Sequence, residues 1–438
     1  MFENIRLLPA TLIRRARDYA RKLWVRVVGM GLLALLAVGV TQLIEPFVPE
    51  ALASHLPGEA ADRLLQIIAN AMLAATIFTM TVMVTVYRNS SSQWTPRVHR
   101  LIMQDRTTQR TLAAFIGAYV YALVAIVLRE LAVFDDERAL VLFVTTVLVL
   151  VLVVLSLVRW VLHLQTFGSL LDTTRQLEEL TRRQLAERLD TPCLGANPLT
   201  GPVPESAWPV LSDESGYIQM FYPEGLNAAA ERHRVAIYLP HPVGSFVFVN
   251  QPLLWVEGTL NEREASREEF EALVRDHVRI GDLRTFDQDP RFGLVVLGEV
   301  ASKALSPGIN DPGTAIDVVS RIGRILSSYH DESQAEDKVR MDRLYVPPLS
   351  PADLLDDGLG ALARDGAHLH EVQHRLQATL SGLMRHPDAG LARAARDMAE
   401  LCLARALADM DFSADRERLL ASAMPEVRAR VVSMAPRK

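Results

Sequence analysis

The chain has 438 residues, of which 50% are hydrophobic, 22% charged and 6% aromatic. Its 46 Lys and Arg against 52 Asp and Glu give a net charge of −6, which excludes a generally basic nucleic-acid binder and a disordered, self-repelling chain. Cysteine occurs at two positions, Cys193 and Cys402, so a disulfide framework and a cysteine-based zinc site are also excluded.

Four long apolar runs lie within the first 165 residues and are the clearest feature of the sequence. They cover residues 27–44, 64–87, 112–128 and 140–158. A helix needs ~20 residues to cross the hydrocarbon core of a bilayer, whereas strands of soluble proteins usually end near ~10 residues. The sequence therefore predicts four transmembrane helices.

Basic residues in the short connecting segments predict how these helices are oriented. Seven Lys and Arg precede residue 27 and five lie in residues 88–110, against three in the segments 45–63 and 129–138 together. Positive residues resist translocation across the membrane. We therefore expect a multi-pass protein of a bacterial inner membrane, with both termini and the 88–110 loop in the cytoplasm.

Polar residues within the second run allow two interpretations. They are one asparagine and four threonines, namely Asn70, Thr76, Thr79, Thr81 and Thr85. These side chains are candidates to line a wet path, but threonine hydroxyls commonly bond to their own helix, which favours helix packing. The middle of the four runs carries no Asp, Glu, Lys or His, which disfavours an ion-coupled carrier.

The third run carries a stripe of small residues at helical spacing. Ala114, Ala118 and Ala122 are four residues apart, with Ala113 and Gly117 beside them. Small residues let two helix backbones approach closely. The stripe therefore predicts a helix interface within or between subunits.

Beyond the fourth run the sequence predicts a cytoplasmic α+β domain. The charged amphipathic stretch from Leu170 to Leu189 is expected to continue the last membrane helix into water, so the tail and membrane module occupy residues 1–190. A Pro/Gly-rich linker is expected at 191–213. A small β-rich module is expected at 214–262, because strand-like patterns occur at 216–222, 235–239, 245–249 and 253–256.

The rest of the domain is expected to be helical. A helical motif region covers 263–330, because Ser266 and Glu269 form a capping box and helices are expected at 292–305 and 312–327. A polar linker at 331–350 and C-terminal helices at 351–438 follow. The segment 242–253 resembles the turn-strand-turn rhythm of lipoyl and biotinyl domains, but it has no lysine to carry a prosthetic group, so no cofactor is predicted.

Two loops before helix starts concentrate residues suited to ligand binding. The first contributes Arg284, Asp287, Asp289 and Arg291, and the second contributes Ser306, Asn310, Asp311 and Thr314. Helix N-termini and arginines attract anions, so the two loops together form one candidate site. The alternative, which the sequence favours, is that Asp289 and Asp311 only cap helices while the arginines pair with aspartates.

Enzyme signatures are sparse, because the sequence contains no G-x-S-x-G elbow, Walker loop or Rossmann fingerprint. His370-Glu-Val-Gln-His374 matches H-E-x-x-H, in which two histidines bind zinc and Glu371 acts as general base. A third ligand would come from His386 or Glu400. The short match and the charged Arg375 after it favour a chance match on a solvated helix, so no metal site is predicted.

Two groups of motifs carry a family resemblance. The first is Ser91-Ser-Gln-Trp-Thr-Pro-Arg97 with Asp105-Arg-Thr-Thr-Gln109 and Phe115 to Tyr121; the second is Arg284 to Gly293 with Ala304 to Ala315. Over roughly residues 20–330 the chain resembles an uncharacterised bacterial membrane-protein family, domain of unknown function twenty-two fifty-four. The resemblance implies four N-terminal transmembrane helices, a cytoplasmic C-terminal region and a bacterial inner-membrane location, and it implies no established activity.

Three functions are compatible with these features. The leading interpretation is a homo-oligomeric scaffold or solute-conducting assembly that the cytoplasmic domain organises or gates. The alternatives are a membrane-anchored ligand-binding or signalling module and, least favoured, a hydrolase using Asp287 and Asp289 or zinc at His370 and His374. Expected partners are the lipid bilayer, further copies of the chain and a small anion or protein segment, with no nucleic acid.

Overall fold

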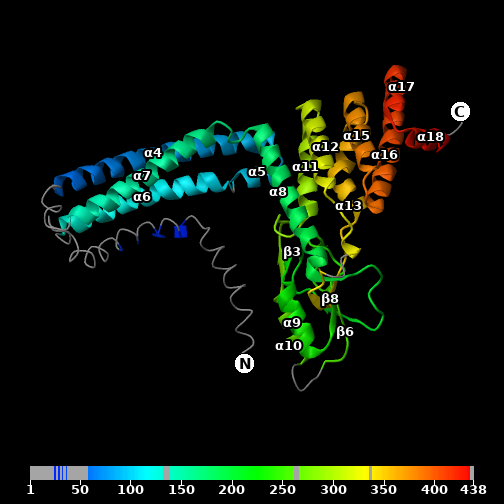
Figure 1. Ribbon diagram of the computed structural model, residues 1–438, viewed down its shortest axis with the longest axis horizontal. Helices are drawn as coiled ribbons and strands as arrows, with labels where there is room; N and C mark the ends of the chain where they lie inside the picture. Colours follow the sequence, from blue (N-terminus) through cyan, green and yellow to red (C-terminus); the bar gives the residue numbers. More distant parts are fainter. Residues whose placement is uncertain are drawn as a thin grey trace. The chain divides into compact units, whose positions relative to one another are not determined.

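The structure is a computed structural model, and it describes residues 58–103, 105–131, 139–260, 266–334 and 338–434, with isolated positions between 24 and 36. The first predicted span, residues 27–44, lies almost entirely outside the described residues. The chain divides into two compact units, residues 1–173 and 174–438. Figure 1 shows the helices and strands of each unit.

The first unit is helical. Its described elements are α4 (Gly58–Gln93), α5 (Pro96–Met103), α6 (Arg106–Glu130) and α7 (Ala139–Leu164). Three described stretches are long and apolar enough to cross a membrane: Glu59–Ser90, Pro96–Glu130 and Leu142–Leu164. They contain the second and third predicted spans and all but the first two residues of the fourth.

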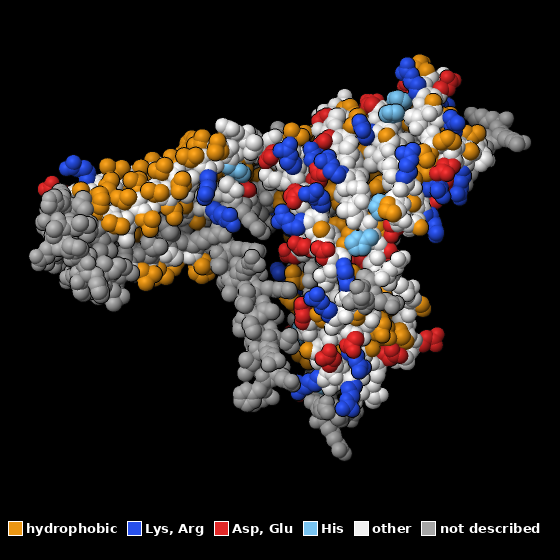
Figure 2. Space-filling model, viewed as in Figure 1, with side chains coloured by type: hydrophobic (Ala, Val, Ile, Leu, Met, Phe, Trp, Pro, Cys, Tyr) orange, Lys and Arg blue, Asp and Glu red, His pale blue; other side chains and the backbone are white. Residues whose placement is uncertain are grey.

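Small, aromatic and some large aliphatic side chains fill the space between these helices, while many other large aliphatic side chains are exposed. Ala118 and Ala122 of the predicted stripe are fully buried, as are Phe115 and Tyr121. The Tyr121 hydroxyl lies 3.1 Å from Thr145 Oγ1. Exposed leucines, valines and isoleucines cover the visible outer face of α4 and α7 in orange (Figure 2), which suits a surface in contact with lipid.

The α7 helix does not continue into the next helix, contrary to the expectation for residues 170–189. It ends at Leu164, and α8 (Leu170–Asp190) begins after a turn. Gly168 in this turn has a φ of +79°, a left-handed conformation that favours glycine. The membrane helix therefore stops several residues before the amphipathic helix starts.

The second unit contains two sheets. The larger has the order β1-β8-β4-β6-β2 and consists of β1 (Ala196–Pro198), β2 (Trp208–Leu211), β4 (Ala236–Tyr238), β6 (Pro252–Glu257) and β8 (Met341–Val346). β8 is parallel to β1 and β4, whereas β6 is antiparallel to β4 and β2. The smaller sheet is antiparallel, in the order β5-β3-β7, with β3 (Gly216–Phe221), β5 (Phe246–Val247) and β7 (Val278–Gly281).

The sheets extend beyond the β-rich module expected at 214–262. β1 and β2 come from the expected linker at 191–213, and β8 comes from the expected polar linker at 331–350. β8 resembles a linker in sequence because Asp342 and Arg343 interrupt it, yet Leu344 and Val346 are buried. Short strands of mixed polarity give only a weak local pattern.

Helices complete the second unit. α9 (Pro223–His233) and α10 (Arg267–Arg275) accompany the sheets, and Ser266 with Glu269 forms the predicted capping box of α10. α11 (Pro290–Ala304) and α12 (Pro312–Leu326) contact one another. The C-terminal helices are α13 (Pro351–Leu355), α14 (Ala361–Asp365), α15 (His370–Leu383), α16 (Ala389–Asp409), α17 (Ser413–Ser422) and α18 (Pro425–Met434).

Candidate functional site

The first of the two predicted loops, residues 284–293, is here called the first motif loop. It is held together by a buried ion pair. Arg284 donates from Nε and Nη2 to the two oxygens of Asp289, at 2.8 and 3.0 Å. Asp289 is 2% exposed and also accepts from the Phe292 backbone NH at 3.0 Å, which caps α11. Both residues are thus used inside the loop, as the capping interpretation expects.

A turn that contains Gly244 packs against this ion pair. Gly244 has a φ of +93°, and a Cβ atom there would lie 2.2 Å from Asp289 Oδ2 and 2.7 Å from Arg284 Nη2. Any larger residue would collide with the pair and strain the backbone. The turn before β5 therefore packs so closely against the motif loop that it requires glycine at position 244.

The loop also connects the smaller sheet with α8. The Gln288 side chain accepts from Phe221 NH at 3.0 Å and donates to Phe221 O at 3.1 Å, at the end of β3. On the other side, the Gln184 amide of α8, oriented to donate, lies 2.7 Å from Asp287 O. Gly293 faces Thr181 of α8 so closely that a Cβ atom would lie 2.2 Å from Thr181 Oγ1.

Arg291 points toward α13 and the residues after it. Its Nε donates to Asp357 at 2.6 Å and its Nη1 to Asp353 at 2.7 Å. The Asp353 side chain is 49% exposed, against 17% for Asp357. One partner of Arg291 is therefore open to solvent.

The second motif loop, residues 306–314, does not lie beside the first. Asp311 caps α12, accepting from Thr314 NH at 3.1 Å and from Thr314 Oγ1 at 2.5 Å, and these bonds lower the pKa of Asp311. Ser306 Oγ bonds to Lys303 O at 2.6 Å, and Asn310 has a φ of +51°. This loop follows the end of α11 and the first loop precedes its start, so the 15-residue helix separates them by about 22 Å. The expected single site is not formed.

The polar residues of the second predicted span also lie on different sides of α4. Thr76, Thr81 and Thr85 donate to backbone carbonyls four residues earlier, at 2.7 to 2.9 Å. Thr79 is fully buried, whereas Asn70, Thr81 and Thr85 are exposed. The bonds back to the helix are those that the packing interpretation expects.

The H-E-x-x-H match lies in the first turns of α15. The rings of His370 and His374 stack with centroids 6.0 Å apart. Both suggested third ligands have other contacts, because His386 Nε2 lies 3.1 Å from Ser327 O and Glu400 lies 3.1 Å from Arg430. Across the described part of the chain, groups of three or more residues suited to hold a metal are absent.

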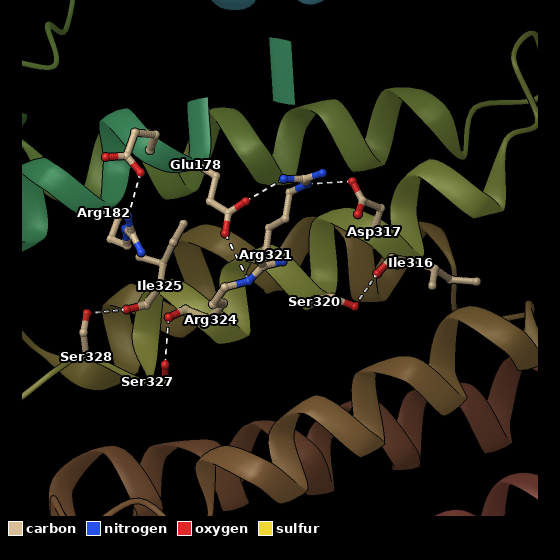
Figure 3. A network of polar contacts seen from close by, with 11 residues as sticks. Glu178, Arg182, Ile316, Asp317, Ser320, Arg321, Arg324, Ile325, Ser327 and Ser328 are labelled. Atoms are coloured by element: carbon tan, nitrogen blue, oxygen red, sulfur yellow. Dashed lines mark hydrogen bonds and ion pairs between the residues drawn. The ribbon is translucent and has the colours of Figure 1, made fainter. Parts of the chain in front are cut away.

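Buried ion pairs that the sequence did not indicate hold α8 against other elements of the second unit. Figure 3 shows Glu178 of α8 between two arginines of α12: its oxygens lie 2.5 Å from Arg321 and 3.2 Å from Arg324. Arg321 also binds Asp317 at 2.6 Å. Glu178 and Arg321 are only 9% and 7% exposed, so this pair is largely shielded from water.

A second buried pair lies near the end of α8. Arg188 donates to both oxygens of Glu332, at 2.6 and 3.1 Å, and to Pro347 O at 3.0 Å. Glu332, which is almost completely buried, also accepts from Leu349 NH at 2.9 Å. These partners lie 144 residues or more beyond Arg188 along the chain, so local pattern gives no signal for them.

A pocket of about 240 Å³ opens beside the first motif loop. Its wall is mostly apolar and includes Phe221, Leu349 and five prolines: Pro240, Pro242, Pro290, Pro347 and Pro348. Polar side chains reach it from the motif loop and from the α13 start: Gln288, Asp289, Arg291, Ser350 and Asp353. The motif loop thus forms one wall of the pocket as well as the contact with α8.

Comparison with known proteins identifies relatives. The family described as "Predicted membrane protein (DUF2254)" matches residues 20–381. Uncharacterized proteins of Mycobacterium bovis and Mycobacterium tuberculosis are each 29% identical over 344 residues, which cover 75% of this chain. The chain spans 64% of the length of these relatives. No solved structure matches the chain.

Proposed function

The chain belongs to this family of predicted membrane proteins, and from that premise we propose that it is a membrane-anchored binding module. In this proposal the proline-lined pocket holds a small ligand. The helix α8, which follows the last apolar helix along the chain, carries the effect of binding toward the membrane segments. We further propose that the membrane is a bacterial inner membrane and that both termini lie in the cytoplasm.

The observation that supports this function most is the double role of the first motif loop. Gln288 and Arg291 line the pocket, while the carbonyl of Asp287 faces Gln184 and Gly293 packs against Thr181 of α8. Asp287 and Gln288 are adjacent in the chain, and Arg291 and Gly293 are two residues apart, so the two roles lie on the same short stretch of backbone. A ligand that shifts this wall therefore changes the packing of α8.

The pocket chemistry suits a small molecule with an apolar body and one polar group. Proline has no backbone NH, so the five prolines offer apolar rings and acceptor carbonyls. The pair of Arg291 and half-exposed Asp353 supplies the charged contact. At about 240 Å³ the pocket is smaller than typical sites for drug-sized ligands, which measure ~300–1,000 Å³.

Thiol chemistry at the pocket wall tests whether it admits such molecules. Ser350 lines the pocket, and Ser413 lies on an exposed surface of α17. Full-length Ser350→Cys and Ser413→Cys proteins are treated with benzyl and ethylammonium methanethiosulfonates, and intact mass gives the rates. Native Cys193 and Cys402 stay unmodified, because burial raises the pKa of both thiols to about 12.

We expect the ratio of benzyl to ethylammonium rates to be several-fold higher at position 350 than at 413, because the pocket concentrates apolar groups. Equal ratios at the two positions, or no reaction at 350, would contradict a ligand pocket. The Ser413→Cys protein controls for the intrinsic reactivity of the two reagents.

A second function, a homo-oligomeric conducting assembly, is favoured by one observation on α4. Asn70, Thr81 and Thr85 are exposed and fall within about 60° of one another around the helix. Described helices α6 and α7 leave this polar face open. Solute efflux from proteoliposomes that falls with Thr81→Leu, and not with Leu148→Ala on the exposed face of α7, supports conduction; no efflux above empty liposomes rejects it.

A further inference from the structure

β5 and the turn that follows it expose a patch of apolar side chains, Phe246, Phe248 and Val249, here called the tip patch. Side chains alternate across the strand, so Val247 is buried while Phe246 and Phe248 are 45% and 56% exposed. Val249 is 48% exposed. Adjacent exposed apolar residues form a continuous surface, which single scattered ones do not.

The tip patch is held in a fixed arrangement. Phe246 packs edge-to-face on Tyr217 at 5.0 Å, and Phe248 packs on Phe246 at 4.9 Å. The backbone beside them is bonded, because Val249 NH donates to Ser215 Oγ at 2.9 Å and Asn250 NH to Ser212 O at 2.8 Å. The aromatic rings are therefore presented outward by the fold.

Charge indicates what kind of surface the tip patch fits. The eighteen residues from Leu239 to Val256 include no Asp, Glu, Lys or Arg, in a chain that is 22% charged. Of the two acids that precede Ser215, Asp213 lies 3.8 Å from Arg275 and Glu214 is exposed outside the patch. The occupant must therefore offer apolar surface and needs no charge of either sign.

The area of the tip patch distinguishes between two candidate partners, a lipid surface and a second copy of the chain. A phenylalanine buries up to ~200 Å², so two half-exposed rings and Val249 offer roughly 300 Å². A stable protein interface needs about 800 Å² from each partner, whereas shallow insertion into a bilayer needs only a few apolar side chains. The chain also contains helices long and apolar enough to cross a membrane, which favours a bilayer as the surface that the tip patch contacts.

We propose that the tip patch inserts into the interfacial layer of the membrane to which the chain belongs. Phe248, the most exposed ring, enters deepest. Insertion of uncharged aromatic rings requires no anionic lipid, so the contact forms on zwitterionic bilayers.

The test uses the full chain in phosphatidylcholine nanodiscs. Phe248→Cys carries an environment-sensitive nitrobenzoxadiazole label, and half of the discs contain lipid with a nitroxide near the headgroup end of its acyl chain. Phe412→Cys is the matched control, because Phe412 is 66% exposed in the connection between α16 and α17. Unchanged melting temperatures confirm that both labelled proteins are folded.

We expect the nitroxide lipid to reduce the emission at position 248 by roughly twofold or more, as for a group at the shallow depth of interfacial segments, and to leave position 412 unchanged. Absence of quenching at 248, or equal quenching at both positions, would overturn the proposal. Concentration-dependent cross-linking between two copies through residue 248, without quenching, would assign the patch to a second copy and overturn it as well.

Discussion

Replacing Glu178 by glutamine tests whether the buried network of α8 holds the second unit together. The change keeps the size of the side chain and removes its negative charge between Arg321 and Arg324. Loss of one partner of a buried ion pair costs about 3–5 kcal/mol. Arg321 keeps Asp317 at 2.6 Å, and Arg324 is 60% exposed and regains water, so we expect a smaller loss of about 2–3 kcal/mol.

The assay is thermal unfolding of the full chain in detergent, followed by tryptophan fluorescence. For a unit of this size a loss of about 2–3 kcal/mol lowers the melting temperature by about 5–10 °C. Glu179→Gln is the matched control on the next residue, because Glu179 is 52% exposed and pairs with an exposed Arg182. Such a surface pair contributes less than about 1 kcal/mol.

Indistinguishable melting temperatures for Glu178→Gln and Glu179→Gln would refute this reasoning. A double-mutant cycle with Arg321→Gln then measures how much of the stability loss comes from the pair of Glu178 and Arg321, because contacting residues show coupling of about 0.5–3 kcal/mol. No coupling between positions 178 and 321 would show that the pair does not hold α8.

Four further predictions concern packing, capping and topology. Gly293→Ala should destabilise the protein by about 1–3 kcal/mol in chemical denaturation, since its Cβ would lie 2.2 Å from Thr181 Oγ1; Gly382→Ala in α15, with open space around it, should be neutral or stabilising. Ala118→Leu in the fully buried stripe should lower thermal stability in detergent more than Leu123→Ala, which changes a side chain 41% exposed; equal tolerance would show that α6 does not pack closely. Hydrogen bonds from Thr314 lower the pKa of Asp311. The extra stability of the wild type over Asp311→Asn should therefore be complete above the unfolded-state pKa of ~3.9, and it should be lost as the pH falls through the lower pKa of the folded state. A stability difference that does not change with pH in acid-unfolding curves would contradict this. Cysteines introduced at Ser54 and Ser91 should react with impermeant maleimide from opposite sides of the membrane; labelling of Ser91 from outside intact cells would reverse the orientation.

Local sequence signals predicted the elements whose causes are local. The start of α12 follows from Asp311 and Pro312, and the start of α10 follows from the capping box at Ser266. Both depend on residues within one helical turn. The second, third and fourth apolar runs likewise predicted their helices by length and composition alone.

Features that join distant residues were not visible in the sequence. Ala196 of β1 pairs with Met341 of β8, and Arg188 binds Glu332 across a similar stretch of chain. A charged residue that will be buried looks the same as one on a solvated helix face, since only the fold supplies its partner. The expected single site failed for a related reason, because loops adjacent in sequence lie at opposite ends of α11.

The central claim is that the pocket and α8 are coupled through the motif loop of residues 284–293. Hydrogen–deuterium exchange of the full-length Ser350→Cys protein, with and without a benzyl group attached at position 350, measures this coupling directly. Ser350 is the N-cap of α13, where its hydroxyl accepts a hydrogen bond from Asp353 NH at 3.3 Å. The comparison is between two forms of one variant, so the loss of this cap cancels. We predict that the benzyl adduct changes exchange in peptides covering 284–293 and 174–190, whereas the same adduct on Ser413→Cys leaves both unchanged. A change confined to the residues around 350, with α8 unaffected, would contradict the account.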